Sequence, residues 1–500
     1  MNVLLIDLGS NRTELNEPIG IESIAGNLLH NIEGIQVHFK WGLIDSLDIS
    51  SSKNDYDFFG ISAKLGTYNN LKRILSLLRE ERKKCRVIVG GPLATFGYME
   101  LLKEFEDIIC VRGEGESTFS KICTNILDTS SFNLGDIPNI VYKKNNCIVE
   151  TKRTVENLNT IRKPYRHYLN NIIDKEGIVR IESSRGCSWS KCDFCSVYEH
   201  YGCSNWRPFP LEYIIEELET LSNSGCLSPY FTDEDFFGGD YERSRQLAEI
   251  ILKKKNENRI NPKMNFFFSA RINDILHEHG VELLKLWKIA GLRELFVGLE
   301  SGVQKQLKRY GKASTPKRNA KVIQLLKNLD IQLDVGYILF DPEMSFDELI
   351  ENIQYIELEN LSRHDSRSLK YIRAQPFTAT SKNYFHKNII NGGLNIDLLY
   401  YPLKYNDERV FNVMNQYYSW EAKLKDITYI IQAKSRGEIF SEEYRVYLKE
   451  QLSAIRELDF IVLKKIVDFV LNRISEKELM TFQNSVEMQK NEVIENIDIK

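Results

Sequence analysis

The sequence predicts a mixed α/β protein with three parts: a doubly wound domain, a partial barrel of six parallel strands, and a small, mostly helical C-terminal domain. Two observations predict this class. Short apolar runs rich in β-formers alternate with amphipathic helical stretches twice along the chain, which is typical of parallel βα units. The alternation stops after about residue 385, where a continuous helical pattern replaces it.

Composition places the chain among globular proteins. Of its 500 residues, 42% are hydrophobic and 27% are charged, and the formal net charge is −4. This balance argues against a nucleic-acid or anionic-lipid partner and favours a small-molecule or peptide substrate. The first residues lack the basic region and cleavage site of a signal peptide, and no run of about 18 apolar residues follows. We therefore expect a cytoplasmic protein without a membrane segment.

The first βα series predicts a doubly wound domain over residues 1–130, with amphipathic helices such as 20–32 and 68–83 between its strands. Residues 131–177 are predicted to form a linker that contains a hairpin around Asn145 and Asn146. The strands expected in the first domain are 2–9, 35–41, 57–63, 85–91 and 107–114.

The second series predicts a barrel over residues 178–385 and a helical domain over residues 386–500, with a long helix from 442 to 474 and a polar tail. Six parallel units suit a partial barrel better than a flat sheet, and chemistry is expected at the carboxyl ends of the strands. The expected strands are 178–184, 227–235, 264–271, 293–301, 331–340 and 368–377.

Three of the nine cysteines lie close together, directly after the first barrel strand: Cys187, Cys192 and Cys195. Such a cluster in a long chain without a signal peptide indicates metal binding rather than disulfides. Thiolates select zinc, Cu(I) or iron-sulfur clusters. A cubane takes four ligands, so three cysteines would leave one iron open. The alternative is a closed zinc site with Cys203 or His200 as its fourth ligand.

These features resemble the radical S-adenosylmethionine (SAM) superfamily, whose hallmark is three closely spaced cysteines after strand one of a partial (βα)6 barrel. Four residues, 188–191, separate the first two cysteines where the common family spacing has three, and Phe194 fits the aromatic position before the third. The resemblance implies a [4Fe-4S] cluster on Cys187, Cys192 and Cys195. It also implies SAM on the open iron and its reductive cleavage to a radical that abstracts hydrogen.

The same resemblance assigns polar residues at later strand ends to SAM. The second strand ends in three acids, where the family binds the SAM ammonium, although a solvated acidic turn would also account for one or two of them. The third strand ends in Ser-Ala-Arg, and the fourth ends in a Gly-Leu-Glu-Ser-Gly segment similar to one that borders the adenine in the family. The residues expected to bind SAM are Asp233, Glu234, Asp235, Ser269, Arg271 and Glu300.

A doubly wound, flavodoxin- or Rossmann-like domain before such a barrel commonly binds cobalamin in this superfamily. The matching pieces include Ser62, Gly90, Gly91 and the segment 112–116, and glycines at strand ends let the backbone approach a large planar ligand. The alternative is that these glycines only make tight turns. The best-known cobalamin signature, an Asp-x-His-x-x-Gly loop whose histidine ligates cobalt, is absent, because the loop after the first strand reads Asp-Leu-Gly-Ser-Asn over residues 7–11. Many cobalamin-dependent radical SAM enzymes also lack this signature.

The resemblance therefore implies a cobalamin-dependent C-methyltransferase that acts on a small-molecule or peptide substrate, with flavodoxin or ferredoxin as its reducing partner. The first alternative is a radical rearrangement, cyclisation, dehydration or epimerisation without methyl transfer. A more remote alternative is a noncatalytic zinc- or cobalamin-binding module.

Overall fold

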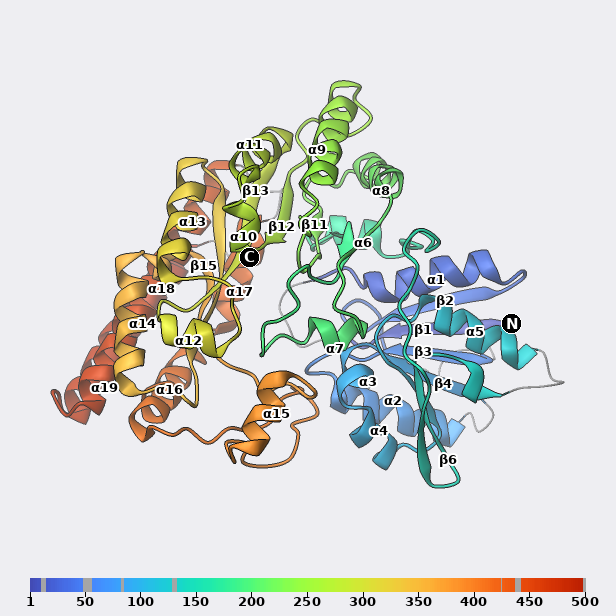
Figure 1. Cartoon of the computed structure of the whole chain (residues 1–500), viewed down its shortest axis with the longest axis horizontal. Helices are drawn as coiled ribbons and strands as arrows, with labels where there is room; N and C mark the ends of the chain where they lie inside the picture. Colours follow the sequence, from blue (N-terminus) through green and yellow to red (C-terminus); the bar gives the residue numbers. More distant parts are fainter. Residues whose placement is uncertain are drawn as a thin grey trace.

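The computed structural model confirms the expected mixed α/β class with a helical C-terminal part. Figure 1 shows the N-terminal sheet at one side, the second sheet beside it, and the C-terminal helices at the far end of the molecule. Ser10, Asn11 and the expected boundary at residues 130 and 131 lie outside the described residues. The structure describes residues 1–9, 15–47, 56–81, 85–127, 133–423, 425–436 and 442–497.

The N-terminal sheet has seven strands in the order β2-β1-β3-β4-β5-β6-β7, and the first five are parallel. This order is that of a doubly wound flavodoxin-like sheet, which binds ligands at its carboxyl edge. The parallel strands are β1 (Asn2–Asp7), β2 (Gln36–Trp41), β3 (Phe58–Ser62), β4 (Arg86–Gly90) and β5 (Ile108–Val111). The helices are α1 (Ile19–Asn31), α2 (Tyr68–Glu81), α3 (Pro92–Phe96), α4 (Tyr98–Glu104) and α5 (Glu116–Leu127).

The expected hairpin is formed by β6 (Ile140–Lys144) and β7 (Cys147–Glu150), preceded by the 3-10 turn η1 (Leu134–Asp136). Asn145 and Asn146 both have positive φ values, 51° and 61°, as a two-residue hairpin turn of type I′ requires. β6 pairs antiparallel with β5. The hairpin thus extends the N-terminal sheet instead of standing alone in a linker.

The second sheet has six strands in the order β15-β14-β13-β12-β11-β8, and every pair is parallel. Strand order follows the chain, as in a barrel that stays open. Its strands are β8 (Arg180–Ile181), β11 (Tyr230–Phe231), β12 (Phe266–Ala270), β13 (Leu292–Glu300), β14 (Gln332–Phe340) and β15 (Asp365–Tyr371). The short strands β9 (Ser184–Arg185) and β10 (Arg207–Pro208) pair antiparallel beside it.

Helices follow the barrel strands and cover the outside of the sheet (Figure 1). Buried aromatic rings fix this packing: Phe236 stacks on Phe268 at 3.9 Å, and Trp287 meets both edge-on. The helical elements of this part are α6 (Leu169–Asp174), α7 (Val197–Tyr201), α8 (Leu211–Asn223), α9 (Tyr241–Asn256), α10 (Ile272–Ile275), α11 (Gly280–Ala290), α12 (Gln304–Arg309), α13 (Pro316–Asn328), α14 (Phe346–Leu358), η2 (Leu361–Arg363) and α15 (Ala379–His386).

A buried arginine joins the two sheets. Arg166 donates to Glu17 at 2.9 Å and to Glu217 at 2.6 Å, and it also donates to the backbone carbonyl of Arg180 in β8. After α15, the chain returns to the N-terminal domain, where Asp397 accepts the backbone N–H groups of Gly66 and Tyr68. These contacts hold the carboxyl edges of both sheets near one another.

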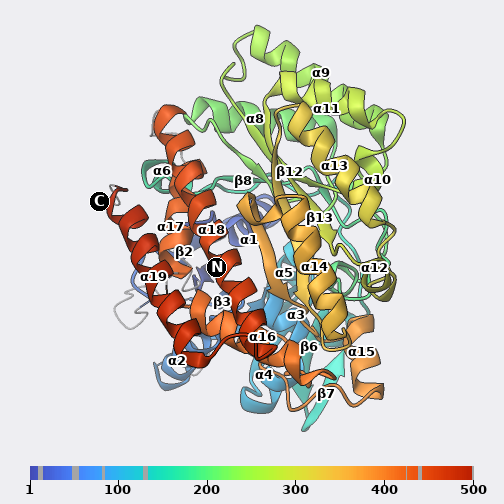
Figure 2. The same cartoon turned by 90° about the vertical axis from the view of Figure 1, so that its left-hand side faces the viewer.

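The C-terminal helices stand side by side in Figure 2 and pack against the last barrel strands. Tyr418 meets Tyr371 of β15 edge-on at 5.2 Å. The expected polar tail is largely helix, because Ser475 and Glu478 form a capping box and Leu479 is buried. None of the described helices combines the length and apolar character of a membrane span. The helices are α16 (Glu408–Glu421), α17 (Lys425–Arg436), α18 (Glu442–Val470) and α19 (Glu476–Glu495).

Candidate functional site

The clustered cysteines lie on one loop between β9 and α7, at the carboxyl rim of the barrel. The loop is held against the turn after α12, since the Trp189 ring N–H donates to the Gly311 carbonyl at 3.1 Å and the Asp193 N–H donates to the Tyr310 carbonyl at 3.0 Å. Gly186 enters the loop with φ +90°, a value that favours glycine. The three half-buried thiols are those of Cys187, Cys192 and Cys195.

The spacing of the three sulfurs fits a cubane better than a zinc ion. Zinc about 2.3 Å from each sulfur would bring the sulfurs about 3.8 Å apart. In the described residues, the one trio of His, Cys, Asp or Glu ligand atoms within 4.8 Å of one another lies elsewhere. At least two of the three cysteine sulfurs therefore lie more than 4.8 Å apart, farther than two sulfurs on one zinc ion. A cubane attaches each sulfur to a different iron and tolerates this separation.

Burial raises the pKa of Cys192 to about 11 and that of Cys195 to about 12, so both thiols would stay protonated at neutral pH without added positive charge. Lys312 lies close enough to lower both pKa values. A bound metal cluster would supply the remaining positive charge that thiolates need.

The three acids after β11 all contact the cysteine loop or the strand before it. Asp233 is 2% exposed and accepts hydrogen bonds from Ser183 and Ser184. Glu234 accepts the Gly186 N–H at 3.2 Å. Asp235 accepts the N–H and hydroxyl of Ser188 and lies 3.7 Å from the Cys187 sulfur. Through these hydrogen bonds the three acids hold the cysteine loop in place. The expected role of the acids in binding SAM stays a prediction.

The remaining expected SAM residues lie at the ends of the next strands. Arg271 follows β12 and donates to Ser188 and, at 3.5 Å, to Asp235, so it joins the loop network. The half-buried Ser269 lies two residues earlier on the same strand. Glu300 ends β13 with φ +65°, where the pairing with β14 shifts register. Backbone strain of this kind is concentrated at functional sites.

Glu300 pairs with a lysine that sequence reasoning missed. Lys312 Nζ lies 3.0 Å from Glu300 Oε1, and both side chains are at most 15% exposed. Burial opposes the charge of Lys312, but Glu300 and the Cys192 sulfur raise its pKa. The rim beside the cysteines therefore carries a fixed positive charge.

A cavity of about 300 Å³ opens at the carboxyl edge of the N-terminal sheet. The expected cobalamin residues Ser62, Gly90 and Gly91 all line it. A Cβ on Gly90 would meet no atom within 4 Å, whereas one on Gly91, which has φ +84°, would lie 2.7 Å from the Ala63 carbonyl oxygen. One glycine thus leaves open space for a ligand, and its neighbour makes a turn that a side chain would strain.

The cavity continues between the sheet and the helices α1 and α5. The lining includes the apolar residues Leu5, Ile21, Ile24 and Phe119 and charged residues from both domains, such as Glu114 and Arg185. A lining that is partly apolar and partly polar suits a ligand that has a flat heteroaromatic group and amide side chains. The donor and acceptor chemistry of this cavity therefore fits part of a cobalamin molecule.

Comparison with known proteins identifies both domains. The family model of the B12 binding domain matches residues 7–122, and that of the radical SAM superfamily matches residues 181–356. The chain therefore contains a B12-binding domain followed by a radical SAM domain. These domains imply a [4Fe-4S] cluster, SAM and cobalamin as cofactors.

This chain is similar in sequence to two relatives and in fold to one solved structure. It is 28% identical to "4'-phospho-dehydrooxetanocin synthase" of Priestia megaterium over 60% of this chain and 42% of the relative. It is 26% identical to "Hopanoid C-3 methylase" of Methylococcus capsulatus over 65% and 61%. The chain thus spans less than two thirds of either relative. The cobalamin-dependent SAM radical enzyme OxsB with aqua-cobalamin bound has the same fold, with TM-score 0.82 at 19% identity over 99% of this chain and 80% of that chain.

A buried ionic cluster connects the B12-binding domain to the cysteine loop of the radical SAM protein. Arg185, two residues before Cys187, lies 2.9 Å from Glu114, 2.7 Å from Glu116 and 2.8 Å from Glu182. Burial alone would raise the pKa of Glu116, but Arg185 lowers this pKa below its ordinary value. Sequence reasoning noted the segment 112–116 but not its partner, which lies 71 residues from Glu114 in the chain.

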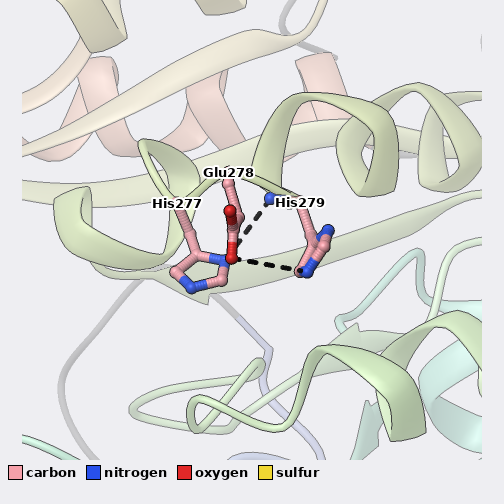
Figure 3. A group of neighbouring side chains, drawn as sticks. All are labelled: His277, Glu278 and His279. Carbon is pink, nitrogen blue, oxygen red and sulfur yellow. Dashed lines mark hydrogen bonds and ion pairs between the residues drawn. The ribbon is translucent and has the colours of Figure 1, made fainter.

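The three possible metal-ligand atoms that lie within 4.8 Å of one another belong to His277, Glu278 and His279, which are consecutive residues between α10 and α11 (Figure 3). The His277 ring stacks on Tyr241 at 4.0 Å, and its Nδ1 accepts the His279 N–H at 3.4 Å. Glu278 and His279 are exposed. Both histidines lie in the loop before α11, where ring stacking accounts for the position of His277.

Proposed function

We propose that this chain is a cobalamin-dependent radical SAM enzyme that acts on a small-molecule or peptide substrate. The observation that carries the proposal is the place of α7. This short helix follows Cys195 directly, and its last two residues, His200 and Tyr201, line the cavity of the B12-binding domain. Only four residues, 196–199, therefore separate a proposed cluster ligand from the proposed cobalamin site.

In this proposal, Cys187, Cys192 and Cys195 ligate the cluster. When bound, the cluster and SAM supply a hydrogen-abstracting radical, and cobalamin supplies a methyl carrier. The chain's own residues position these groups: Asp235 and Arg271 hold the loop through Ser188, and Lys312 provides positive charge beside the sulfurs.

Glu300, Ser269 and Arg271 are proposed to border SAM, with Asp233, Glu234 and Asp235 holding the loop around it. Ser62, Gly90 and Gly91 are proposed to border cobalamin. Both assignments follow from the position of these residues at the carboxyl edges of the two sheets, where α/β folds bind ligands. A cytoplasmic electron donor such as flavodoxin or ferredoxin completes the proposal.

We infer C-methylation as the reaction. It is supported by the similarity to a relative named as a hopanoid methylase. The second candidate is a radical rearrangement or related reaction without methyl transfer, and the similarity to a dehydrooxetanocin synthase and to OxsB favours it. The two differ in one product, because methyl transfer from SAM leaves S-adenosylhomocysteine.

The test replaces each loop cysteine by alanine in anaerobically reconstituted protein, with Cys203→Ala as the matched control from the same segment. We expect loss of the cluster's iron and of dithionite-dependent 5′-deoxyadenosine in Cys187→Ala, Cys192→Ala and Cys195→Ala, and neither loss in Cys203→Ala. Retention of the full iron content in all three would refute the ligand assignment. S-adenosylhomocysteine formed with 5′-deoxyadenosine would favour methylation over the second candidate.

A further inference from the structure

A second group of metal-ligand side chains lies on the turn between α10 and α11, outside the cysteine loop and the cavity. His277, Glu278 and His279 each offer one ligand atom, and these atoms all lie within 4.8 Å of one another. Figure 3 shows the three side chains gathered on the same side of the turn. Three consecutive residues thus present two imidazoles and one carboxylate to a single point. The proposed function uses none of them.

The ligand atoms need little movement to meet one metal ion. His279 Nε2 lies 3.7 Å from Glu278 Oε1. Nitrogen and oxygen ligands of a tetrahedral zinc ion, each about 2.0–2.1 Å from the metal, lie about 3.3 Å apart. The Glu278 and His279 side chains are 78% and 56% exposed, so rotation about their side-chain bonds can close the difference without moving the core. The same exposure leaves room for water in the remaining coordination positions.

His277 is the most firmly held member of the group. Its ring stacks on Tyr241 of α9, with centroids 4.0 Å apart and planes at 11°. The Tyr241 hydroxyl donates to Asp274 Oδ1 at 3.0 Å, which fixes the tyrosine in turn. His277 Nδ1 accepts the His279 N–H in a long hydrogen bond of 3.4 Å, so its lone pair faces the turn that carries the other two ligands. Neighbouring groups that orient a histidine ring are typical of metal sites.

The backbone of the turn is also fixed. The Gly280 N–H donates to the His277 carbonyl at 2.9 Å, and the Leu283 N–H donates to the His279 carbonyl at 3.0 Å, where α11 begins. A Cβ on Gly280 would lie 2.3 Å from the Ile275 carbonyl oxygen, so the two helices close tightly around the turn. Preorganisation of this kind lowers the entropy cost of binding a ligand. The backbone positions of the three ligands are therefore set before a metal arrives.

The ligand set selects the kind of metal. Two imidazole nitrogens favour zinc, copper, nickel or iron over magnesium and calcium, which prefer oxygen ligands alone. Zinc accepts two histidines and one glutamate with a further position left to water. We propose that His277, Glu278 and His279 bind a zinc ion whose coordination is completed by water. The inference goes beyond the proposed function and does not depend on it, because these ligands belong neither to the cysteine loop nor to the lining of the cavity.

The test is the titration of the full chain with Zn²⁺ in an anaerobic calorimeter, after the iron-sulfur cluster has been reconstituted so that the loop cysteines are occupied. His277→Ala, His279→Ala and Glu278→Gln should each weaken zinc binding at least about tenfold, because even the loss of a group that only orients a metal ligand costs about 10–100-fold. Tyr241→Leu removes the stacked ring and should weaken binding about tenfold. Tyr241→Phe keeps the ring and should bind zinc as the wild type does.

Two matched controls remove a carboxylate and a histidine from elsewhere. Glu282→Gln changes the first turn of α11, and His386→Ala changes the last turn of α15; both should bind zinc as the wild type does. Glu278→Gln and His279→Ala alter exposed side chains and should melt with the wild type, so their loss of zinc cannot come from misfolding.

Three results would overturn the inference. The first is a wild-type chain that takes up no zinc. The second is zinc binding that is unchanged in both histidine variants, or that falls equally in the two controls. The third is zinc that is lost in Cys187→Ala but kept in His277→Ala, which would assign the ion to the cysteine loop and would count against the proposed cluster as well.

Discussion

Arg185→Met should separate the two cofactor sites by breaking the buried ionic cluster between them. Arg185 is 5% exposed, and its carboxylate partners Glu114 and Glu116 are 6% and 5% exposed. Removing one partner of a buried ion pair costs about 3–5 kcal/mol. Because Arg207 keeps a 3.0 Å contact with Glu114, we expect a loss of about 3 kcal/mol in the free energy of unfolding. If the affected domain unfolds as a unit of about 150–250 residues, its melting temperature should fall by about 6–12 °C.

The destabilisation should depend on pH with a defined sign. In the wild type the pKa of Glu116 is below its ordinary value of 4.5, so its contribution is present above that pH and is lost as the pH falls. Without Arg185, burial would raise the pKa of Glu116, and the folded state would bind a proton that the unfolded chain lacks. The stability of the variant should therefore fall more steeply than that of the wild type as the pH rises from 5 to 8.

The assay is thermal unfolding followed by circular dichroism at pH 5, 6.5 and 8, together with cobalamin retention on gel filtration. Arg363→Met removes an exposed pair with Glu457 and serves as the control that should change neither quantity. We expect Arg185→Met to lose cobalamin as well as stability. A variant that melts within 1–2 °C of the wild type at pH 8, roughly the span of scatter for a surface change, would refute the reasoning.

Further substitutions test the barrel rim and the cavity. Lys312→Met removes a positive charge beside Cys192 and leaves Glu300 unpaired, so the midpoint potential of the cluster should fall by about 60–120 mV. This is the effect of one charge about 6–12 Å away at an effective dielectric of 20. A redox titration that finds no shift would contradict the placement of Lys312 beside the cluster. Gly91→Ala should destabilise the protein by about 1–2 kcal/mol because its φ is +84° and its Cβ would lie 2.7 Å from a carbonyl oxygen. Gly90→Ala, whose Cβ meets no protein atom, should leave the melting temperature unchanged and weaken cobalamin binding; equal melting of the two variants would contradict this distinction.

The sequence was sufficient for the strands and for the cysteine loop because both are local signals. Alternation of apolar runs and helices predicts parallel units, and the ends of parallel strands must meet at one edge. The polar residues after each barrel strand therefore indicated the rim where Glu300 and Arg271 lie. The capping box at Ser475 and Glu478 was also a local signal, and it would have predicted α19 had it been used.

The partners of buried charges could not be predicted, because they are long-range contacts. Arg185 and Glu114 lie 71 residues apart, and Arg271 and Ser188 lie 83 apart. The acids after β11 illustrate the consequence. Their position at the rim suggested open ligand groups, but Asp233 is enclosed by two serines that no spacing rule connects with it. His200 entered the sequence argument only as a zinc ligand, since nothing local places it in the cavity of the other domain.

The measurement that tests the central claim most directly is the metal content of the anaerobically reconstituted wild-type chain after incubation with cobalamin, followed by an assay of SAM cleavage with dithionite. The account predicts about four irons and one cobalt per chain, with 5′-deoxyadenosine as a product. One zinc per chain, no retained cobalt and no cleavage of SAM would contradict it.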